Sequence, residues 1–288
     1  MGKKYIENRI LLIGSGDWSK NYVKTIEKID SSKLLIHIPA RKALKELLKD
    51  KNKFVNKIEK EHINKVIICS TPENQYKILR LIHDLDLQLI LEKPLFTNLE
   101  QKQFYEELPK HHKKKIIVNH FHFFSEQFQD FIKDVSGKKI KKLHIYDYGS
   151  GPIRKNIMPI FDWGPHPLGI ISLLCPNFKL LNVKKLNKDL HQKWFIKLIG
   201  DPIKEIKVLT GNGFAKKKRE IYVLDSNGNI SYFKLNDSLH SESPMTSLLN
   251  FSLEAKANNH FYAKKTFNLA FMSCVSLMEI NNFNKKSY

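Results

Sequence analysis

Short apolar runs alternate with helical patterns over the first 120 residues of this chain. Each run is bounded by glycine, proline or polar residues, as expected of strands that are buried on both faces. The runs are Arg9–Ile13, Lys33–Ile38, Val66–Cys69, Leu87–Leu91 and Lys114–Asn119, and the helices predicted between them are Lys20–Ile29, Ala43–Lys49, Glu73–Leu85 and Asn98–Glu107, the last with a start signal at Thr97. Strands that alternate with helices predict an α/β domain with a doubly wound parallel sheet over residues 1–120.

The pattern changes after residue 120. A helix predicted at Glu126–Val135 is followed by strands in which apolar and polar residues alternate, with turn signals such as Asn227-Gly228 between them. These strands are Ile140–Tyr148, Trp194–Ile199, Ile206–Thr210, Glu220–Asp225 and Ile230–Leu235. We therefore expect a second, α+β domain over residues 121–288 with a largely antiparallel open sheet. The last predicted helix, Thr266–Ile280, covers this sheet or returns to the first domain.

The first predicted strand ends in a glycine-rich turn. Gly14 and Gly16 follow the dinucleotide-binding pattern G-x-G-x-x-G/A, and Ser19 takes the third position. The first glycine of this pattern makes a tight turn, the second lets a pyrophosphate approach the backbone, and the third place needs a small residue. The strand, the turn and a helix occur in the order that this role requires. The sequence therefore predicts a dinucleotide site at Gly14, Ser15, Gly16, Asp17 and Trp18.

The end of the second strand indicates which dinucleotide is bound. NAD-binding proteins place a carboxylate there for the ribose 2′-hydroxyl, but this chain has Arg41 and Lys42 and no carboxylate. Because an arginine can pair bidentately with a 2′-phosphate, the sequence favours NADP over NAD. The alternative is that both residues simply open the next helix.

The fourth apolar run stops abruptly at Glu92-Lys93-Pro94. Pro94 cannot donate to a sheet ladder, and it biases Lys93 towards an extended backbone. A lysine is thus predicted at the carboxyl end of a buried strand, where open α/β sheets bind ligands. The third run leads into Ser70-Thr71-Pro72 at the same edge. We expect Ser70, Thr71 and Pro72, together with Glu92 and Lys93, to lie beside the cofactor.

A proline-rich segment holds the second candidate group. Asp162 and His166 are four residues apart, so they share a face in a helical turn. Pro165 and Pro167 fit only the first turn of a helix, which places His166 at a helix N-terminus, ahead of the apolar stretch Ile170–Cys175. That end disfavours the imidazolium while Asp162 favours it, so the pair could poise a proton carrier near neutral pH. A capping aspartate beside a structural histidine is the alternative.

Charge and cysteine content narrow the class of protein. The net charge is +20, but the lysine clusters are not interleaved with aromatic residues along the sequence, so we expect an anionic small substrate and no specific nucleic acid. No apolar run approaches the roughly 20 residues of a membrane span, so no membrane association is expected. Cys69, Cys175 and Cys274 lack metal-ligand spacing and lie in apolar surroundings. They predict reduced thiols in a cytoplasmic protein without a bound metal.

Taken in order, four motifs resemble the glucose–fructose oxidoreductase and inositol dehydrogenase (Gfo/Idh/MocA) family. They are Gly14-x-Gly16, Ser70-Thr71-Pro72, Glu92-Lys93-Pro94 and Asp162-x-Gly164-x-His166. The resemblance spans nearly the whole chain and implies a Rossmann domain, followed by a domain whose open sheet often forms an oligomer interface. A homodimer or homotetramer is therefore expected. Two positions depart from the family, because Gln75 stands where histidine is common and Gly169 where aspartate is common.

The resemblance also implies an activity. It is the transfer of a hydride between the nicotinamide of NAD(P) and a secondary alcohol or ketone of a sugar or sugar-nucleotide. In this reading His166 is the general acid/base, Lys93 hydrogen-bonds the reacting oxygen, and Asp162 orients both. The alternative is a non-catalytic regulator that binds a cofactor or a sugar on the same fold. The sequence identifies neither the sugar nor the direction of the reaction.

Overall fold

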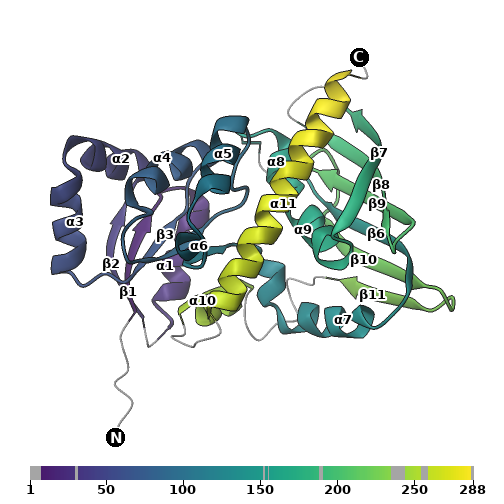
Figure 1. The fold of residues 1–288 in the computed structure, drawn as a ribbon, viewed down its shortest axis with the longest axis horizontal. Helices are drawn as coiled ribbons and strands as arrows, with labels where there is room; N and C mark the ends of the chain where they lie inside the picture. The colour runs from purple at the N-terminus through teal and green to yellow at the C-terminus, as the bar shows by residue number, and fades with distance from the viewer. Residues whose placement is uncertain are drawn as a thin grey trace, which may run out of the picture. The chain divides into compact units, whose positions relative to one another are not determined.

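The computed structural model describes residues 8–29, 32–151, 153–154, 156–187, 191–234, 244–253 and 259–286, which form two compact units (Figure 1). The first unit holds the described residues up to Phe121, with helix α10 (Pro244–Leu253) and the first part of helix α11 (Asn259–Lys286) as far as Asn268. The second unit holds residues 122–234 and the rest of α11 from Leu269. Helix α11 therefore contributes side chains to the cores of both units.

The sheet of the first unit is entirely parallel. Its strands are β1 (Asn8–Ile13), β2 (Ser32–Ile38), β3 (Lys65–Ile68), β4 (Gln88–Leu91) and β5 (Ile116–Val118), in the order β2-β1-β3-β4-β5. The apolar side chains of β1, β3, β4 and β5 are almost completely buried, which is why runs without polar alternation form strands here. The predicted doubly wound parallel sheet is confirmed.

The helices of the first unit lie on both faces of this sheet. They are α1 (Asp17–Ile26), α2 (Ala40–Lys49), α3 (Lys51–Lys60), α4 (Pro72–Ile82), α5 (Leu99–Glu107) and the short α6 (Lys110–Lys113). The strand order reverses at β1, so right-handed crossovers place α1 on one face and α2 and α4 on the other. In agreement, α2 packs on α4 and α1 packs on α10. The carboxyl ends of β1 and β3 thus flank the switch point at which such sheets form a ligand crevice.

The sheet of the second unit is mixed and mostly antiparallel. It contains β6 (Ile140–Tyr148), β7 (Asn177–Leu186), β8 (Lys193–Asp201), β9 (Glu205–Gly211), β10 (Lys218–Asp225) and β11 (Ile230–Lys234), in the order β11-β10-β6-β9-β8-β7. Only the β6–β9 pair is parallel. Along β6, Leu143 and Ile145 are buried whereas His144 and Tyr146 are half-buried, so one face forms the core and the other is open. The predicted second sheet is confirmed.

Three helices cover the buried face of this second sheet. They are α7 (Glu126–Ser136), which follows the short 3₁₀ helix η1 (Phe121–Phe124), α8 (Pro159–Trp163) and α9 (Pro165–Leu174). Helix α7 packs on β11, α8 on β9 and α9 on β6. None of the helices in the described part of the chain is long and apolar enough to span a membrane.

Several predicted helix boundaries are wrong, and each has a local cause. Helix α1 spans Asp17–Ile26 rather than Lys20–Ile29, because Gly16 is its N-cap and the helix begins at once. Helix α2 begins at Ala40 and not at Ala43, directly after Pro39. Helix α9 begins at Pro165, which places His166 in its first turn as predicted, and Ile170–Leu174 forms its later part. Helix α4 ends at Ile82 instead of Leu85. The cap of α5 is Asn98, whose side chain accepts from the backbone of Gln101, and not Thr97.

Several elements were not predicted at all. They include the short α6 and η1, helix α3, which buries only Phe54 and Ile58, helix α10, which has no charged residue to mark a polar face, and β7, an edge strand with few buried side chains. Helix α11 is also longer at both ends than the predicted Thr266–Ile280. Leu235, the last residue of the final predicted strand, lies outside the described residues.

Candidate active site

The turn between β1 and α1 has the shape that a dinucleotide phosphate requires. Gly14 has φ +156°, and a Cβ added there would lie 2.1 Å from the carbonyl oxygen of Cys69, so only glycine fits. A Cβ added to Gly16 would meet nothing within 4 Å. The turn is therefore closed beneath Gly14 and open at Gly16, in front of the backbone amides that begin α1. This open space fits a pyrophosphate held at the helix N-terminus.

The neighbouring residues of the turn complete this shape. Ser19, in the third position, is buried and donates from Oγ to the carbonyl oxygen of Gly16 at 2.6 Å, so a small residue is needed there. Ser15 and Asp17 are exposed. The hydrogen bond and the charge of Lys20 lower the pKa of Asp17, whose carboxylate lies 2.7 Å from the ammonium. That partner offsets the negative charge of Asp17 beside an expected anion.

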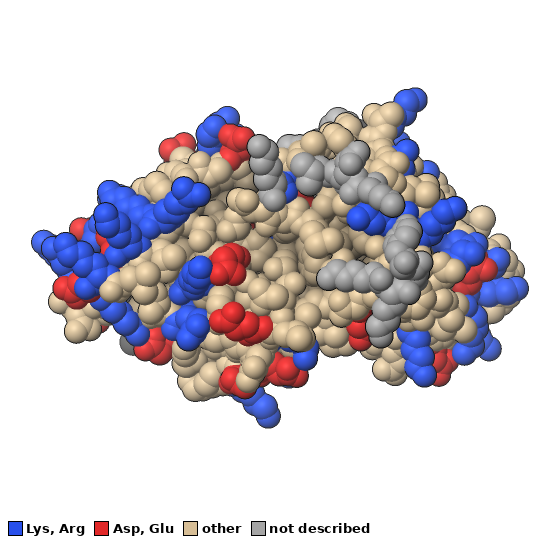
Figure 2. Space-filling view, turned by 90° about the horizontal axis from the view of Figure 1, so that it is seen from above, with Lys and Arg blue, Asp and Glu red and all other residues tan. Residues whose placement is uncertain are grey.

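Arg41 and Lys42 lie close to this turn along the backbone. Strand β2 ends at Ile38, whose carbonyl accepts from the amide of Gly14 at 2.9 Å. Helix α2 starts two residues later, so Arg41 and Lys42 occupy its first turn, and both are exposed. Helices α2 and α3 carry four Lys or Arg each and one Glu each, and Figure 2 shows such side chains gathered at this end of the unit.

A buried carboxylate connects α1 with the segment that carries Lys93. Glu92 follows β4 directly and is 8% exposed. Its Oε1 accepts hydrogen bonds from Trp18 Nε1 at 2.9 Å, Tyr22 Oη at 2.7 Å and Asn119 Nδ2 at 2.7 Å. Burial, and then the charge of Glu92, raise the pKa of Tyr22 well above its usual range, so this hydroxyl stays a donor. Three neutral donors thus replace the water that the carboxylate has lost.

Gln75 holds the backbone of the same residue. Its amide donates from Nε2 to the carbonyl oxygen of Glu92 at 3.0 Å and accepts at Oε1 from the amide of Glu92 at 2.9 Å. Gln75 is fully buried on α4. A single side-chain amide can satisfy both backbone groups of one residue, as a neighbouring strand would. The departure from histidine at position 75 therefore gives a rigid connection between α4 and the residue before Lys93.

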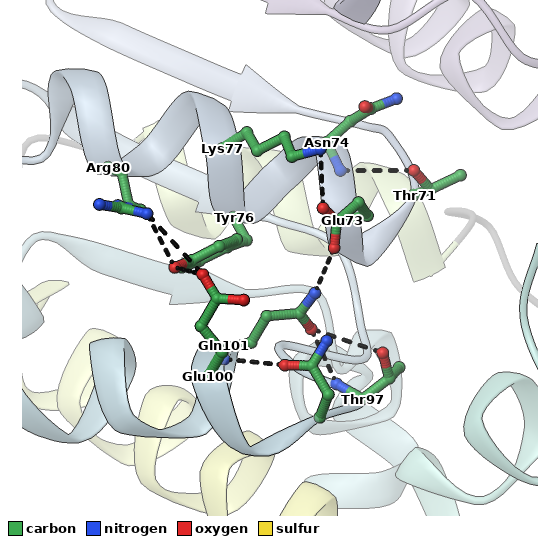
Figure 3. Close-up of polar contacts among 10 residues, drawn as sticks. Thr71, Glu73, Asn74, Tyr76, Lys77, Arg80, Thr97, Glu100 and Gln101 are labelled. Atoms are coloured by element: carbon green, nitrogen blue, oxygen red, sulfur yellow. Dashed lines mark hydrogen bonds and ion pairs between the residues drawn. The ribbon is translucent and has the colours of Figure 1, made fainter.

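A second buried glutamine holds the other end of this loop, as Figure 3 shows. Gln101 accepts at Oε1 from the backbone amide of Thr97 at 3.0 Å and donates from Nε2 to Glu73 at 2.8 Å. Further contacts tie α4 to α5, because Tyr76 donates to Glu100 at 2.8 Å. Residues 92–97 are therefore clamped at both ends.

Thr71 and Pro72 have a structural role in this arrangement. Thr71 caps α4, accepting at Oγ1 from the amide of Asn74 at 3.5 Å, and Pro72 is the buried first residue of that helix. Ser70 precedes them, two residues after the end of β3, and is half-buried. The segment thus lies at the predicted edge of the sheet. Whether these three residues contact a cofactor stays a prediction.

Lys93 is half-buried and precedes a cis peptide bond to Pro94. Its charge acts on His120, which is fully buried just beyond β5. Burial first, and the charge of Lys93 second, lower the pKa of His120 to about 3. A neutral imidazole therefore lies within the electrostatic reach of Lys93.

Asp162 and His166 belong to the second unit. Asp162 lies in α8, and His166 is the second residue of α9, at the helix N-terminus that the prolines predicted. Gly164 joins the two helices in a helical conformation. A Cβ there would lie 2.4 Å from Leu277 and 2.5 Å from the carbonyl oxygen of Ile160, so the position requires glycine. The ring of His166 is buried and meets the ring of His122 edge-on, with 4.9 Å between centroids.

The carboxylate of Asp162 is paired with an arginine. Oδ1 of Asp162 accepts from Nη1 of Arg154 at 3.1 Å. The side chain of Asp162 is 12% exposed and that of Arg154 is 49% exposed. The ion pair orients the carboxylate from the segment that follows β6. Gly169, where the family commonly has aspartate, is buried within α9.

The structure brings together only part of the predicted set. Within the first unit it joins Trp18 to Glu92 and places the charge of Lys93 beside His120, whereas Asp162 and His166 lie in the second unit. Sequence reasoning missed Tyr22, Gln75 as a positioning group, Asn119, His120, His122 and Arg154. Asn119 and His120 had a usable signal, because they follow β5 at the same sheet edge as Lys93. Arg154 had none.

Metal chemistry has no candidate in the described part of the chain, where no group of three or more His, Cys, Asp and Glu side chains could hold an ion. Cys69, Cys175 and Cys274 are buried, and none of them is in a disulfide.

Comparisons with known proteins agree with this geometry. A family model described as an oxidoreductase family with an NAD-binding Rossmann fold (GFO_IDH_MocA) matches residues 8–120. No curated protein sequence matches the chain.

Solved structures match the chain over nearly its whole length. A dehydrogenase from Chromobacterium violaceum has a TM-score of 0.75 at 10% identity, covering 95% of this chain and 94% of its own. A myo-inositol dehydrogenase from Corynebacterium glutamicum has 0.68 at 13% identity, covering 98% and 96%. A 3-ketoreductase mutant from Actinomadura kijaniata, in complex with TDP-benzene and NADP, has 0.71 at 10% identity, covering 96% and 98%. At these identities the likeness is one of fold.

Proposed function

This chain belongs to the Gfo/Idh/MocA oxidoreductase family, whose NAD-binding Rossmann fold it carries over residues 8–120, and we propose that it transfers a hydride between NAD(P) and a secondary alcohol or ketone of a sugar or sugar-nucleotide. The observation that carries the proposal is the setting of Lys93. It follows a buried strand at the sheet edge of the glycine turn, in a loop clamped by Gln75 and Gln101. Structural relatives named as a myo-inositol dehydrogenase and a 3-ketoreductase support the substrate class.

The proposed chemistry divides between the cofactor and the chain. With the pyrophosphate of NAD(P) held at the Gly14–Gly16 turn, the cofactor would supply the hydride chemistry. In the oxidative direction Lys93 donates a hydrogen bond to the reacting hydroxyl oxygen and stabilises its alkoxide character. His166 takes the hydroxyl proton as the carbon–hydrogen bond breaks, and it returns that proton in the reductive direction. Asp162 orients the reacting groups through its carboxylate.

The direct test is a cofactor titration followed by a substrate panel. We expect the fluorescence of NADPH or NADH to change on binding, and the cofactor absorbance at its reduced band to change with one member of a panel of sugars, keto-sugars and nucleotide-sugars. A cofactor carrying deuterium at C4 would show whether its hydride reaches the product. Binding of cofactor without turnover of any member would favour the alternative, a regulator that binds but does not react.

The same proposal includes NADP as the preferred cofactor. Arg41 and Lys42 lie in the exposed first turn of α2, in a basic surface, and no carboxylate ends β2. We expect Arg41→Ala to weaken NADPH binding by roughly 10-fold and NADH binding by less than about 2-fold, because only NADPH carries the 2′-phosphate. Exposed Lys53→Ala on α3 is the matched control. Equal loss for the two cofactors in Arg41→Ala would contradict the preference.

We also propose a homodimer or homotetramer through the open face of the second sheet. That face exposes Tyr232 and Ile230, with Tyr146 and Tyr222 half-buried beside them. Sedimentation of Tyr232→Glu against the parent chain tests it, since a charge at the centre of such an interface should shift the chain towards the monomer. A reduced, cytoplasmic setting stays a prediction from the three cysteines.

A further inference from the structure

We propose that Arg154 binds an oxyanion of the substrate, so that the substrate of this protein is a sugar carrying a carboxylate or phosphate near its reacting carbon. The inference rests on the proposed function, because it takes Asp162 as a group that faces the substrate. It assigns a specificity role to a residue that no sequence motif singles out.

The geometry leaves most of the Arg154 guanidinium available. A guanidinium has five N–H donors in a planar fork, and among contacts of the described residues only Nη1 is engaged, with Asp162. Nearly half of the side-chain surface, 49%, is exposed. An arginine whose only task was to hold Asp162 would be expected to engage the carboxylate with both arms of the fork and to be covered. Arg154 instead reaches it with one atom.

Two glycines determine the path of the segment that carries Arg154. A Cβ on Gly149 would be 3.0 Å from the ring of Trp163, and one on Gly151 would be 2.6 Å from the same ring. The two glycines thus let the chain pass directly over Trp163, the neighbour of Asp162. The amide of Phe214 donates to the carbonyl oxygen of Gly149 at 3.1 Å and anchors the start of this path.

Two lysines lie near the start of this path. The backbone of Lys217 lies beside Gly149, 3.5 Å from the position of an added Cβ. Lys193 lies over the ring of Phe214, 5.3 Å from its centroid. Asp147 does not offset them, because it is buried and paired with Arg219 at 3.3 Å. The N–H groups of Arg154 that Asp162 does not engage can receive an oxyanion in the plane of the guanidinium fork, whereas a neutral sugar would form only uncharged hydrogen bonds with them.

The consequence is a choice between classes of sugar. A uronate or a sugar phosphate would share Arg154 with Asp162, and its anion would lie one hydrogen-bonded group away from the catalytic aspartate. A neutral polyol would gain at most ordinary hydrogen bonds there. A charge-assisted hydrogen bond contributes roughly 1.5–3 kcal/mol, which corresponds to about 10- to 100-fold in affinity.

The test is a calorimetric titration of the full chain, with and without NADP⁺, using three probes. These are D-glucose, D-glucuronate and D-glucose 1-phosphate, so the last two distinguish a carboxylate from a phosphate. We expect one anionic probe to bind at least about 10-fold more tightly than glucose. Arg154→Met should remove that difference, and Arg154→Lys, which keeps the charge but not the fork, should restore part of it.

Lys141→Met, which removes an exposed cation elsewhere in the second unit, is the matched control and should bind all three probes as the parent does. Equal binding of the three probes by the parent, binding of none, or retention of the anion preference in Arg154→Met would each overturn the inference. Failure of the proposed function is separate, because it appears as loss of dinucleotide binding in the same titrations without sugar.

Discussion

Two carboxylates show how differently the two units prepare their polar groups. Glu92, in the first unit, is buried and accepts at one oxygen from three uncharged donors. Asp162, in the second, accepts from one half-exposed guanidinium. A network of neutral donors responds little to salt, whereas a half-exposed ion pair is screened by salt and open to a competing anion. The first unit is therefore pre-organised, and the second leaves the partner of its aspartate available to a ligand.

The difference follows from what each arrangement costs when it is disturbed. Leaving one buried donor or acceptor without a partner costs about 1–3 kcal/mol. Glu92, Tyr22 and Asn119 depend on one another in this way, since Asn119 also donates to Tyr22 at 2.9 Å. An exposed ion pair typically contributes under about 1 kcal/mol. Substitutions should therefore have large effects around Glu92 and small effects on stability around Arg154.

The largest expected effect is on the reaction itself. Lys93→Met should lower the single-turnover rate of hydride transfer by roughly 100- to 1,000-fold, because methionine keeps the apolar stem but has neither charge nor donor. The affinity for NADPH should stay within about 3-fold, since the glycine turn is unchanged. Exposed Lys110→Met, at the start of α6, is the control. Near-parental turnover in Lys93→Met would remove the lysine from the proposed mechanism.

The next effect concerns pH, through His120. Its folded pKa of about 3 lies below the ordinary 6.5, so between these values the unfolded chain binds a proton that the folded chain does not. The stability is therefore fully present above pH 6.5 and is lost as pH falls towards 3, by up to about 1.4 kcal/mol per pH unit. Urea titrations at pH 7, 6, 5 and 4 measure this slope.

His120→Asn should flatten that slope, whereas the exposed Gln103→Asn, which removes no titratable group, should leave it unchanged. Because other groups also titrate in acid, the decisive quantity is the difference between parent and variant at each pH. Parallel curves for the parent and His120→Asn would mean that His120 is protonated in the folded chain, and that the charge of Lys93 does not reach it.

A smaller effect is expected at Gln75. Replacing it with leucine leaves the buried amide and carbonyl of Glu92 without their partner, and should lower the free energy of unfolding by roughly 2–4 kcal/mol. Gln103→Leu is the control, because it removes an exposed amide whose hydrogen bond among described residues is to Glu107, at 2.8 Å. This substitution should change the free energy of unfolding by less than about 0.5 kcal/mol. Urea titration of both variants measures the contrast. Similar values for the two would mean that the clamp on Glu92 is not needed.

The Gln75 contact also marks where sequence reasoning stopped. The parallel sheet, the glycine turn and the helix start at His166 were predictable, because each depends on residues within one or two elements. The partners of Glu92 were not, because Tyr22 and Asn119 are 70 and 27 residues away along the chain. They meet at Glu92 only through the order of the strands.

Elements with weak burial were equally hard to predict. Strand β7, at the edge of the second sheet, reads NFKLLNVKKL, and the register shift between Leu180 and Asn182 breaks its alternation of apolar and polar residues. Helix α3 has two buried residues in ten. In both elements tertiary contacts determine the structure, so the local sequence pattern does not predict it. Arg154 belongs to the same class, since irregular backbone brings it to Asp162.

The smallest expected effect is on stability at the ion pair of Arg154 and Asp162. Arg154→Met should change the free energy of unfolding by less than about 1 kcal/mol in 0.05 M NaCl, and by less still in 0.5 M, because the pair is half-exposed and screened. Urea titrations at the two salt concentrations measure this. A loss above roughly 2 kcal/mol, insensitive to salt, would mean that Arg154 is a structural support like Gln75. A small, salt-dependent change in the free energy of unfolding, together with a large loss of anion affinity, would show that Arg154 serves ligand binding rather than stability. The comparison of Asp162 with Glu92 predicts this result.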